Sequence, residues 1–305
     1  MMRPFVLWVI VGVLASMRSI PIGQAHGEEL PAVKSRSAVV IDRETGAEIF
    51  GKDADEIRAI ASTTKIFVAM AVRKKGLDLD GWTEITHVDA KQARGGARTR
   101  LDVRRVFNNK DLLRAMLMAS DNRAPTALGR AAGMSPEQLV AAMNDIAKDL
   151  QLKRTKFTDP TGLHGNVSTA REMAIALRAA LEDDVLREIM GTQSTLVVGK
   201  GGKPKINYGT TNQALVANKW DVIGGKTGYT EAAGYCFVTG ARFHGRDVVM
   251  TFLGASGKQT RFADFNRVAE WLDKGAPGSK VALVPTTEKR KLKVSGEVRG
   301  RVAKK

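Results

Sequence analysis

Ser62-Thr63-Thr64-Lys65 combines a hydroxyl and an amine at a spacing that suits acyl transfer. On a helix the two side chains lie about one turn apart on the same face, so the amine can reach the hydroxyl. A serine hydroxyl is a weak nucleophile and needs an adjacent base of this kind. Taken alone, the motif is better explained by a serine that caps a helix and a lysine exposed to solvent.

Two polar triplets are further candidates for a site. Ser120-Asp121-Asn122 follows an apolar helical stripe and precedes another helical run, so a polar turn between helices would have the same composition. Lys226-Thr227-Gly228 ends a β-type run, which by itself indicates a strand end and a turn. Gly225-Lys226-Thr227 also matches the end of a phosphate-binding loop, but the first glycine of that motif falls on Trp220. We therefore reject a nucleotide-binding loop.

Histidine and cysteine residues do not indicate a metal centre. His87, His164 and His244 lack the spacing of metal ligands and any G-x-S-x-G motif, although His164 lies in a turn that can approach a site. Cys236 is the single cysteine, which excludes an internal disulfide framework and a cysteine zinc site. We expect no metal and no cofactor.

The elements that position these residues begin with two short β-type runs, Ser37–Asp42 and 47–50, around a hairpin turn at Glu44-Thr45-Gly46. A helix-compatible segment starts at Ser62, and the pattern is helical from about residue 110 to 190.

Two helix starts have sequence signals, namely Ser135-Pro136 and the capping-box spacing of Thr169 to Glu172. Strand patterns return at 222–226, 235–241 and 248–253, and a closing helix begins near Phe262. The order predicts an α+β (α/β) fold, with a five-stranded antiparallel sheet flanked by helices and an inserted helical lobe at about 66–190.

Composition and charge narrow the class of partner. The chain has 305 residues, 43% hydrophobic and 26% charged, as in ordinary globular proteins, and its formal charge of +16 favours an anionic partner. The basic residues accompany no zinc-finger spacing and no aromatic RNA-binding motif, so we predict no nucleic-acid partner.

The N-terminus predicts export. Arg3 precedes an apolar run at 4–15, which is too short to span a bilayer, and small residues lead up to Ala25. We predict a signal peptide at 1–25, with an uncleaved N-terminal anchor as the alternative. Residues 26–279 form one catalytic domain in this interpretation, and 280–305 form a basic tail with nine Lys or Arg residues and two Glu residues.

The three motifs S-x-x-K, S-D-N and K-T-G occur once each and in this order, in a chain predicted to be exported. Together they resemble serine β-lactamases and penicillin-binding proteins, and most closely the low-molecular-weight DD-peptidases of the penicillin-binding protein 7-type endopeptidase branch. The similarity extends over roughly residues 35–275. The stretches that support it are LLRAMLMASDNRAPT (112–126), DPTGL (159–163), NVSTARE (166–172), NKWDVIGGKTGYTEAAGYC (218–236) and FAD (262–264).

The resemblance implies roles for the catalytic residues. Ser62 attacks a D-alanyl carbonyl and Lys65 takes its proton, which requires a lysine kept partly neutral by burial and by the nearby charge of Lys226. Ser120 relays a proton to the leaving amine, and Asn122 holds Lys65 and the substrate amide.

The resemblance also assigns substrate-binding residues. Lys226 and Thr227 bind the carboxylate next to the scissile bond, and Gly228 leaves room for the substrate backbone. The N–H groups of Ser62 and Tyr229 form the oxyanion hole.

The implied activity is cleavage of D-alanyl-D-alanine and/or D-alanyl-diaminopimelate cross-links in peptidoglycan, in the periplasm or cell envelope, with β-lactams as covalent inhibitors. The basic cluster of Lys91, Arg94, Arg98 and Arg100 is either a solvated loop or a lining of the cleft that meets carboxylates of wall peptides. The basic tail predicts peripheral contact with an anionic envelope surface.

Two alternatives have the same motifs. A class A-like β-lactamase needs a deacylating glutamate in an E-x-x-L-N motif, and Glu137, Glu172, Glu182 and Glu188 all have other followers. A non-catalytic, penicillin-sensing wall-binding protein would normally have lost one of the motif residues.

Overall fold

The computed structural model describes residues 30–97 and 99–275. The predicted signal peptide at 1–25 and the predicted basic tail at 280–305 lie outside these residues. In the part that is described, no helix has the length and apolar character needed to cross a membrane.

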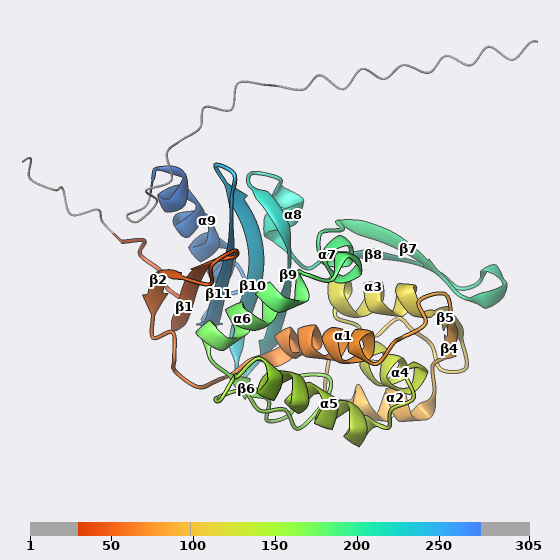
Figure 1. Ribbon diagram of the computed structural model, residues 1–305. Helices are drawn as coiled ribbons and strands as arrows, with labels where there is room; N and C mark the ends of the chain where they lie inside the picture. Colours follow the sequence, from red (N-terminus) through yellow and green to blue (C-terminus); the bar gives the residue numbers. More distant parts are fainter. Residues whose placement is uncertain (1–29, 98, 276–305) are drawn as a thin grey trace, which may run out of the picture.

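A five-stranded antiparallel sheet forms the centre of the molecule, as the sequence predicted (Figure 1). Its order is β2-β1-β11-β10-β9, so the first strands along the chain pair with the last. The strands are β1 (Ser37–Asp42), β2 (Glu48–Lys52), β9 (Asp221–Thr230), β10 (Gly234–Phe243) and β11 (Arg246–Ala255). The strand β9, which contains K-T-G, is therefore at one edge.

Both faces of the sheet are covered by helices. Alternate residues of a strand point to opposite faces, and β1 is buried along its whole length. Val39 and Ile41 join the larger core under α6 (Ala170–Ala180), whereas Ala38 and Val40 join a second core under α9 (Thr260–Asp273). Figure 1 shows these two helices on opposite sides of the sheet.

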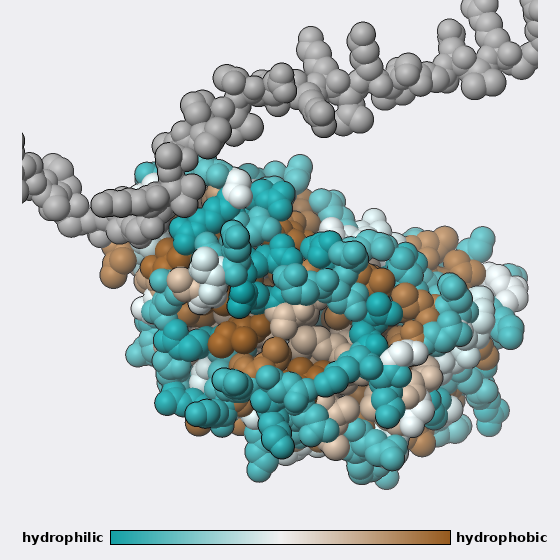
Figure 2. Space-filling view, viewed as in Figure 1, coloured by the Kyte–Doolittle hydropathy of each residue, from teal (hydrophilic) through white to brown (hydrophobic). Residues whose placement is uncertain are grey.

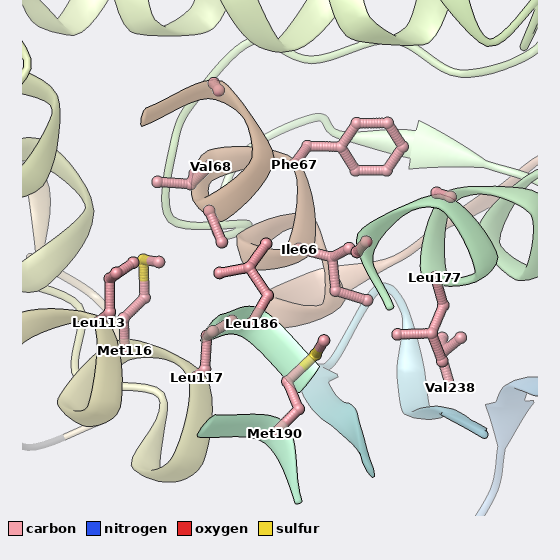
Figure 3. Packing of buried hydrophobic residues seen from close by; sticks show 14 of the residues in the cluster. Ile66, Phe67, Val68, Leu113, Met116, Leu117, Leu177, Leu186, Met190 and Val238 are labelled. Atoms are coloured by element: carbon pink, nitrogen blue, oxygen red, sulfur yellow. The ribbon is translucent and has the colours of Figure 1, made fainter. Parts of the chain in front are cut away.

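A helical body packs beside the sheet around α1, which carries the chain away from Ser62. Ile66, Phe67 and Val68 of α1 have no exposed surface. Figure 3 shows them among apolar side chains of the neighbouring helices, including Leu113, Met116, Leu117, Leu177, Leu186 and Met190. These side chains come from α3 (Asn109–Ala119), α6 and α7 (Asp184–Met190). The helical body also contains α1 (Lys65–Lys74), α4 (Ala124–Ala131) and α5 (Pro136–Asp149).

The two predicted helix starts differ in their capping. The Ser135 hydroxyl accepts a hydrogen bond from the Gln138 N–H, and the Ser135 N–H donates to Gln138 Oε1, with Pro136 as the first helical residue. Thr169 accepts from the Glu172 N–H, but the Glu172 carboxylate accepts from Arg154 and Thr155 instead. The capping box predicted at 169–172 is therefore only half formed.

Short elements, most of which the sequence pattern did not predict, complete the described fold. The longest is the hairpin of β7 (Ser194–Val198) and β8 (Lys205–Gly209), which extends along the helical body to the right of Figure 1. Two small ribbons and four short helices accompany it: β3 (Arg58–Ala59) with β6 (Val167–Ser168), β4 (Trp82–Glu84) with β5 (Val106–Asn108), η1 (Ala61–Thr64), α2 (His87–Gln92), η2 (Lys200–Gly202) and α8 (Gln213–Ala217). Figure 2 shows hydrophilic residues over most of the face in view.

Candidate active site

Ser62 lies in η1, a single 3-10 turn that leads directly into α1. The turn is fixed at Ile60, whose carbonyl accepts from the Thr63 hydroxyl at 2.6 Å. Lys65 is the first residue of α1, and its Nζ lies 2.8 Å from Ser62 Oγ. The predicted contact between the hydroxyl and the amine is present in this structure.

Lys65 is buried and its amine contacts three acceptors. Nζ donates to Ser62 Oγ at 2.8 Å, to Asn122 Oδ1 at 2.7 Å and to the Thr161 carbonyl at 2.8 Å. Burial lowers the pKa of Lys65 from 10.5 to about 7, and the carboxylates of Asp159 and Asp121 oppose the shift. An amine with this pKa is partly neutral near pH 7 and can accept a proton from the hydroxyl next to it.

The turn at 159–164 positions the third of these acceptors. The Asp159 carboxylate accepts from the N–H groups of Thr161, Gly162 and His164. Asn166 Nδ2 donates to the Asp159 carbonyl at 2.8 Å and to Thr64 Oγ1 at 3.1 Å, which joins the turn to η1. The D-P-T-G-L and N-V-S-T stretches thus hold a carbonyl against Lys65.

Gly162 lies directly against the segment that carries Ser62. Its φ is +85°, and a Cβ at this position would lie 2.1 Å from the Ala61 carbonyl oxygen and 3.0 Å from the Ser62 nitrogen. No side chain fits in this space, so the close approach of the two segments requires glycine.

Ser120 ends α3 in the left-handed conformation, with φ 64° and ψ 28°. This turn brings Ser120 to 3.1 Å from Lys226 Nζ and Asn122 to Lys65. Asp121 points the other way, where its carboxylate accepts from the Arg100 N–H at 2.8 Å and the Tyr208 hydroxyl at 2.9 Å. The middle residue of S-D-N therefore anchors the turn, and the outer two face the buried lysines.

The K-T-G motif lies within β9 and not at a strand end, which corrects the sequence prediction. Pairing with β10 continues past it, from Val238 opposite Lys226 to Gly234 opposite Thr230. Lys226 is buried and donates to Ser120 Oγ and to the Thr227 carbonyl. Burial, together with the like charges of Lys65 and Arg261, holds the pKa of Lys226 well below its usual value.

Gly228 is required by a contact within the protein. A Cβ there would lie 2.9 Å from the Ser62 nitrogen, 3.0 Å from the Ala61 Cβ and 3.1 Å from the Ile60 carbonyl oxygen. η1 therefore packs on β9 at this glycine, which brings the backbone of the nucleophile beside the backbone of K-T-G.

These residues surround a cleft of about 990 Å³. Of the predicted site residues, Ser62, Ser120, Asn122, Thr227, Gly228 and Tyr229 line it, and His164 lines it as well. Lys65 and Lys226 are buried next to residues of this lining. His87 lies on α2 and His244 near the end of α9, and neither of them lines this cleft.

Residues 24–257 match the family model described as D-alanyl-D-alanine carboxypeptidase (peptidase S11). The chain belongs to this family. It is 32% identical over 258 residues to a D-alanyl-D-alanine endopeptidase of Escherichia coli, covering 84% of this chain and 81% of that protein. A D-alanyl-D-alanine endopeptidase of Pseudomonas aeruginosa is 31% identical over 284 residues, with 93% and 90% covered.

Solved structures agree with this assignment. A penicillin-binding protein homolog from Mycobacterium tuberculosis superposes with a TM-score of 0.76 at 25% identity, covering 84% of this chain and 97% of that one. A mutant of the Streptomyces K15 DD-transpeptidase gives a TM-score of 0.74 at 25% identity, with 79% and 98% covered. The family resemblance and the fold predicted from the sequence are confirmed.

Among the residues of the DD-peptidase cleft that the sequence analysis did not predict, Arg261 is the most deeply involved with K-T-G. Arg261 of α9 is 5% exposed and lines the cleft, and it donates to the carbonyls of Gly228 and Cys236 at 2.8 and 2.9 Å. Its Nε is buried and has no hydrogen-bond partner among the residues that the structure describes. The F-A-D stretch, which is part of the sequence similarity, begins directly after Arg261. Asp264 of that stretch fixes α9 by accepting hydrogen bonds from Ser35 and from the Lys34 N–H.

In the basic cluster at 91–100, the described basic residues Lys91, Arg94 and Arg100 do not line the cleft of this DD-peptidase. Gly95, Gly96 and Ala97 line the cleft, and Arg98 lies outside the described residues. Arg100 is directed to β8, where it donates to the Asn207 carbonyl.

Proposed function

We propose that this protein is a penicillin-binding serine DD-peptidase that cleaves D-alanyl bonds of peptidoglycan stem peptides through an acyl-enzyme on Ser62. The observation that supports it best is the buried Lys65 amine, 2.8 Å from the Ser62 hydroxyl and with a pKa of about 7. Family membership and the relatives' names support the reaction class.

Acylation follows from the arrangement of these groups. Neutral Lys65 accepts the proton as Ser62 Oγ bonds to the D-alanyl carbonyl carbon. The N–H groups of Ser62 and Tyr229 stabilise the oxyanion. When the C–N bond breaks, the leaving amine takes a proton through Ser120, and water later hydrolyses the ester to regenerate Ser62.

The substrate carboxylate is bound by groups that otherwise lack a counter-charge. Lys226 and Arg261 are buried basic side chains, and neither forms an ion pair within residues 30–97 and 99–275. Buried charges of one sign are costly until an opposite charge arrives. A carboxylate beside Thr227 neutralises this site, and both D-alanyl-D-alanine and D-alanyl-diaminopimelate bonds have a carboxylate next to the leaving amine.

We place the enzyme in the periplasm or cell envelope, with peptidoglycan as its polymer partner and β-lactams as covalent inhibitors. Rapid β-lactam hydrolysis is not favoured, because the sequence contains no E-x-x-L-N motif. Among the glutamates considered for that role, Glu172 accepts hydrogen bonds from the Arg154 N–H and the Thr155 hydroxyl.

Intact-protein mass spectrometry with penicillin tests the proposal. The wild type should gain one penicilloyl adduct that persists, because the sequence lacks the E-x-x-L-N motif that positions a deacylating glutamate in class A β-lactamases. Ser62→Ala should gain none. A persistent adduct on Ser62→Ala, or none on the wild type, contradicts the assignment.

A further inference from the structure

A basic hollow lies apart from the cleft, between the segment before β5 and the end of the β7–β8 hairpin. Its volume is about 500 Å³, and it is lined by Asp102, Arg105, Lys203, Pro204 and Lys205. The three basic residues are exposed, and no ion pair within the described residues includes them. Three cations against one carboxylate favour an anionic ligand.

β8 connects this hollow to the cleft. The strand begins with Lys205 in the hollow and ends at Gly209, and the next residues, Thr210 and Thr211, line the cleft. Five residues of extended chain span about 17 Å. A polymer held in the cleft can therefore reach the hollow along one strand.

Arg100 lies between the two sites and is held in place. It donates to the Asn207 carbonyl at 2.6 Å, and its guanidinium carbon lies 3.9 Å from the centre of the Tyr208 ring. The Tyr208 hydroxyl and the Arg100 N–H both bind the Asp121 carboxylate. Arg100 remains exposed, so exposed basic side chains extend from the neighbourhood of the S-D-N turn to the hollow. We call Arg100, Arg105, Lys203 and Lys205 the basic track.

We propose that the basic track is a second binding site for peptidoglycan and binds carboxylates of stem peptides next to the one in the cleft. This inference rests on the proposed function, because it takes the occupant of the cleft as one peptide of a polymer. Neighbouring stem peptides bear free carboxylates and are tethered to the bound one, so their effective concentration at the track is high. A small ligand such as penicillin does not reach the track.

Two matched triple variants of the full chain test the site. Arg105→Glu/Lys203→Glu/Lys205→Glu reverses the hollow, and Lys75→Glu/Lys148→Glu/Lys153→Glu makes the same charge change at exposed lysines near the ends of α1 and α5. Both are made in a Ser62→Ala background, so that the wall is not digested, and are sedimented with purified peptidoglycan across a salt series. We expect the hollow variant to bind about tenfold more weakly at low salt and with a smaller salt dependence, and the control to change less than twofold. Equal losses, or no loss, overturn the track.

Penicillin acylation separates this inference from the proposed function. With Ser62 present, both triple variants should be acylated at the wild-type rate. If the wild type is not acylated, the proposed function fails. If it is acylated but the two variants bind the wall equally, only the track is wrong. Binding of the same variants to phosphatidylglycerol vesicles distinguishes a polymer site from a lipid site. If the hollow variant loses vesicle binding but keeps wall binding, the hollow binds lipid and the proposal is overturned.

Discussion

At the scale of single residues, the state of Lys65 sets the pH range in which Ser62 reacts. Its pKa is lowered to about 7, and only the neutral amine can accept the Ser62 proton. Lowering the pH protonates Lys65, so the acylation rate should fall below pH 7 and level off well above it. Penicillin acylation rates measured from pH 5 to 9 check this. A rate that is constant over this range would mean that Lys65 is not the base.

The two buried lysines should have different roles. Lys65→Ala removes the base, so acylation should be slower by about 10²–10⁴-fold even at saturating penicillin. Lys226→Ala removes a charge that faces the substrate carboxylate, so its main defect should be a weaker apparent affinity. The dependence of the acylation rate on penicillin concentration separates the two, and melting curves show whether each variant is folded. Near-normal saturated acylation of Lys65→Ala would contradict its role.

Sequence reasoning reached the residues of the three motifs because their types and order are specific, but it missed Arg261. The contact of Arg261 with the Gly228 carbonyl joins α9 to β9. The two residues are far apart in the sequence, so no local sequence pattern predicts this contact. Sequence reasoning also missed that Gly228 packs against the Ile60–Ser62 segment, while its predicted role in leaving room for substrate stays a prediction.

At the scale of elements, the sequence predicted helix starts that depend on local capping, but not strands whose extent depends on tertiary pairing. Ser135-Pro136 marked the start of α5 correctly because the cap and the first-turn proline act locally. The β7–β8 hairpin has short runs and a glycine-rich connection, and its packing on α3 appears only in the tertiary structure. β9 continues to Thr230 because β10 pairs with it, and the sequence of β9 alone does not reveal this.

The turn at 159–164 should matter for both stability and catalysis through Gly162. Gly162→Ala introduces a Cβ 2.1 Å from the Ala61 carbonyl oxygen, whereas Gly76→Ala has a similar φ of +80° with nothing within 4 Å. The control should lose about 1–2 kcal/mol of unfolding free energy from backbone strain. Gly162→Ala should lose about 1–3 kcal/mol more and should also acylate more slowly. Urea unfolding and penicillin acylation of both variants measure this, and equal effects would show that the turn does not support Ser62.

At the scale of the whole molecule, the basic tail at 280–305, which lies outside the described residues, is predicted to hold the enzyme at an anionic surface. Contacts between exposed charges are screened beyond roughly 8–10 Å at physiological salt, so salt should release the protein without detergent. A chain truncated after Gly278 should keep acylation of Ser62 and bind isolated envelopes more weakly. Sedimentation of both forms across a salt series is the measurement, and identical, salt-resistant retention would exclude the tail as the tether.

The pairing of β1 with β11 governs when an active enzyme can exist during its synthesis. Ser37 is opposite Leu253, so the centre of the sheet cannot close until nearly the whole described chain is available. Contacts of such high sequence separation form slowly, whereas helices such as α1 and α3 depend on nearer partners. Ser62 and Lys226 can come together only after β9 and its neighbouring strands have formed. For a chain exported as proposed, the part that has already emerged should therefore be unreactive toward the wall, and activity should begin only when translocation is nearly complete.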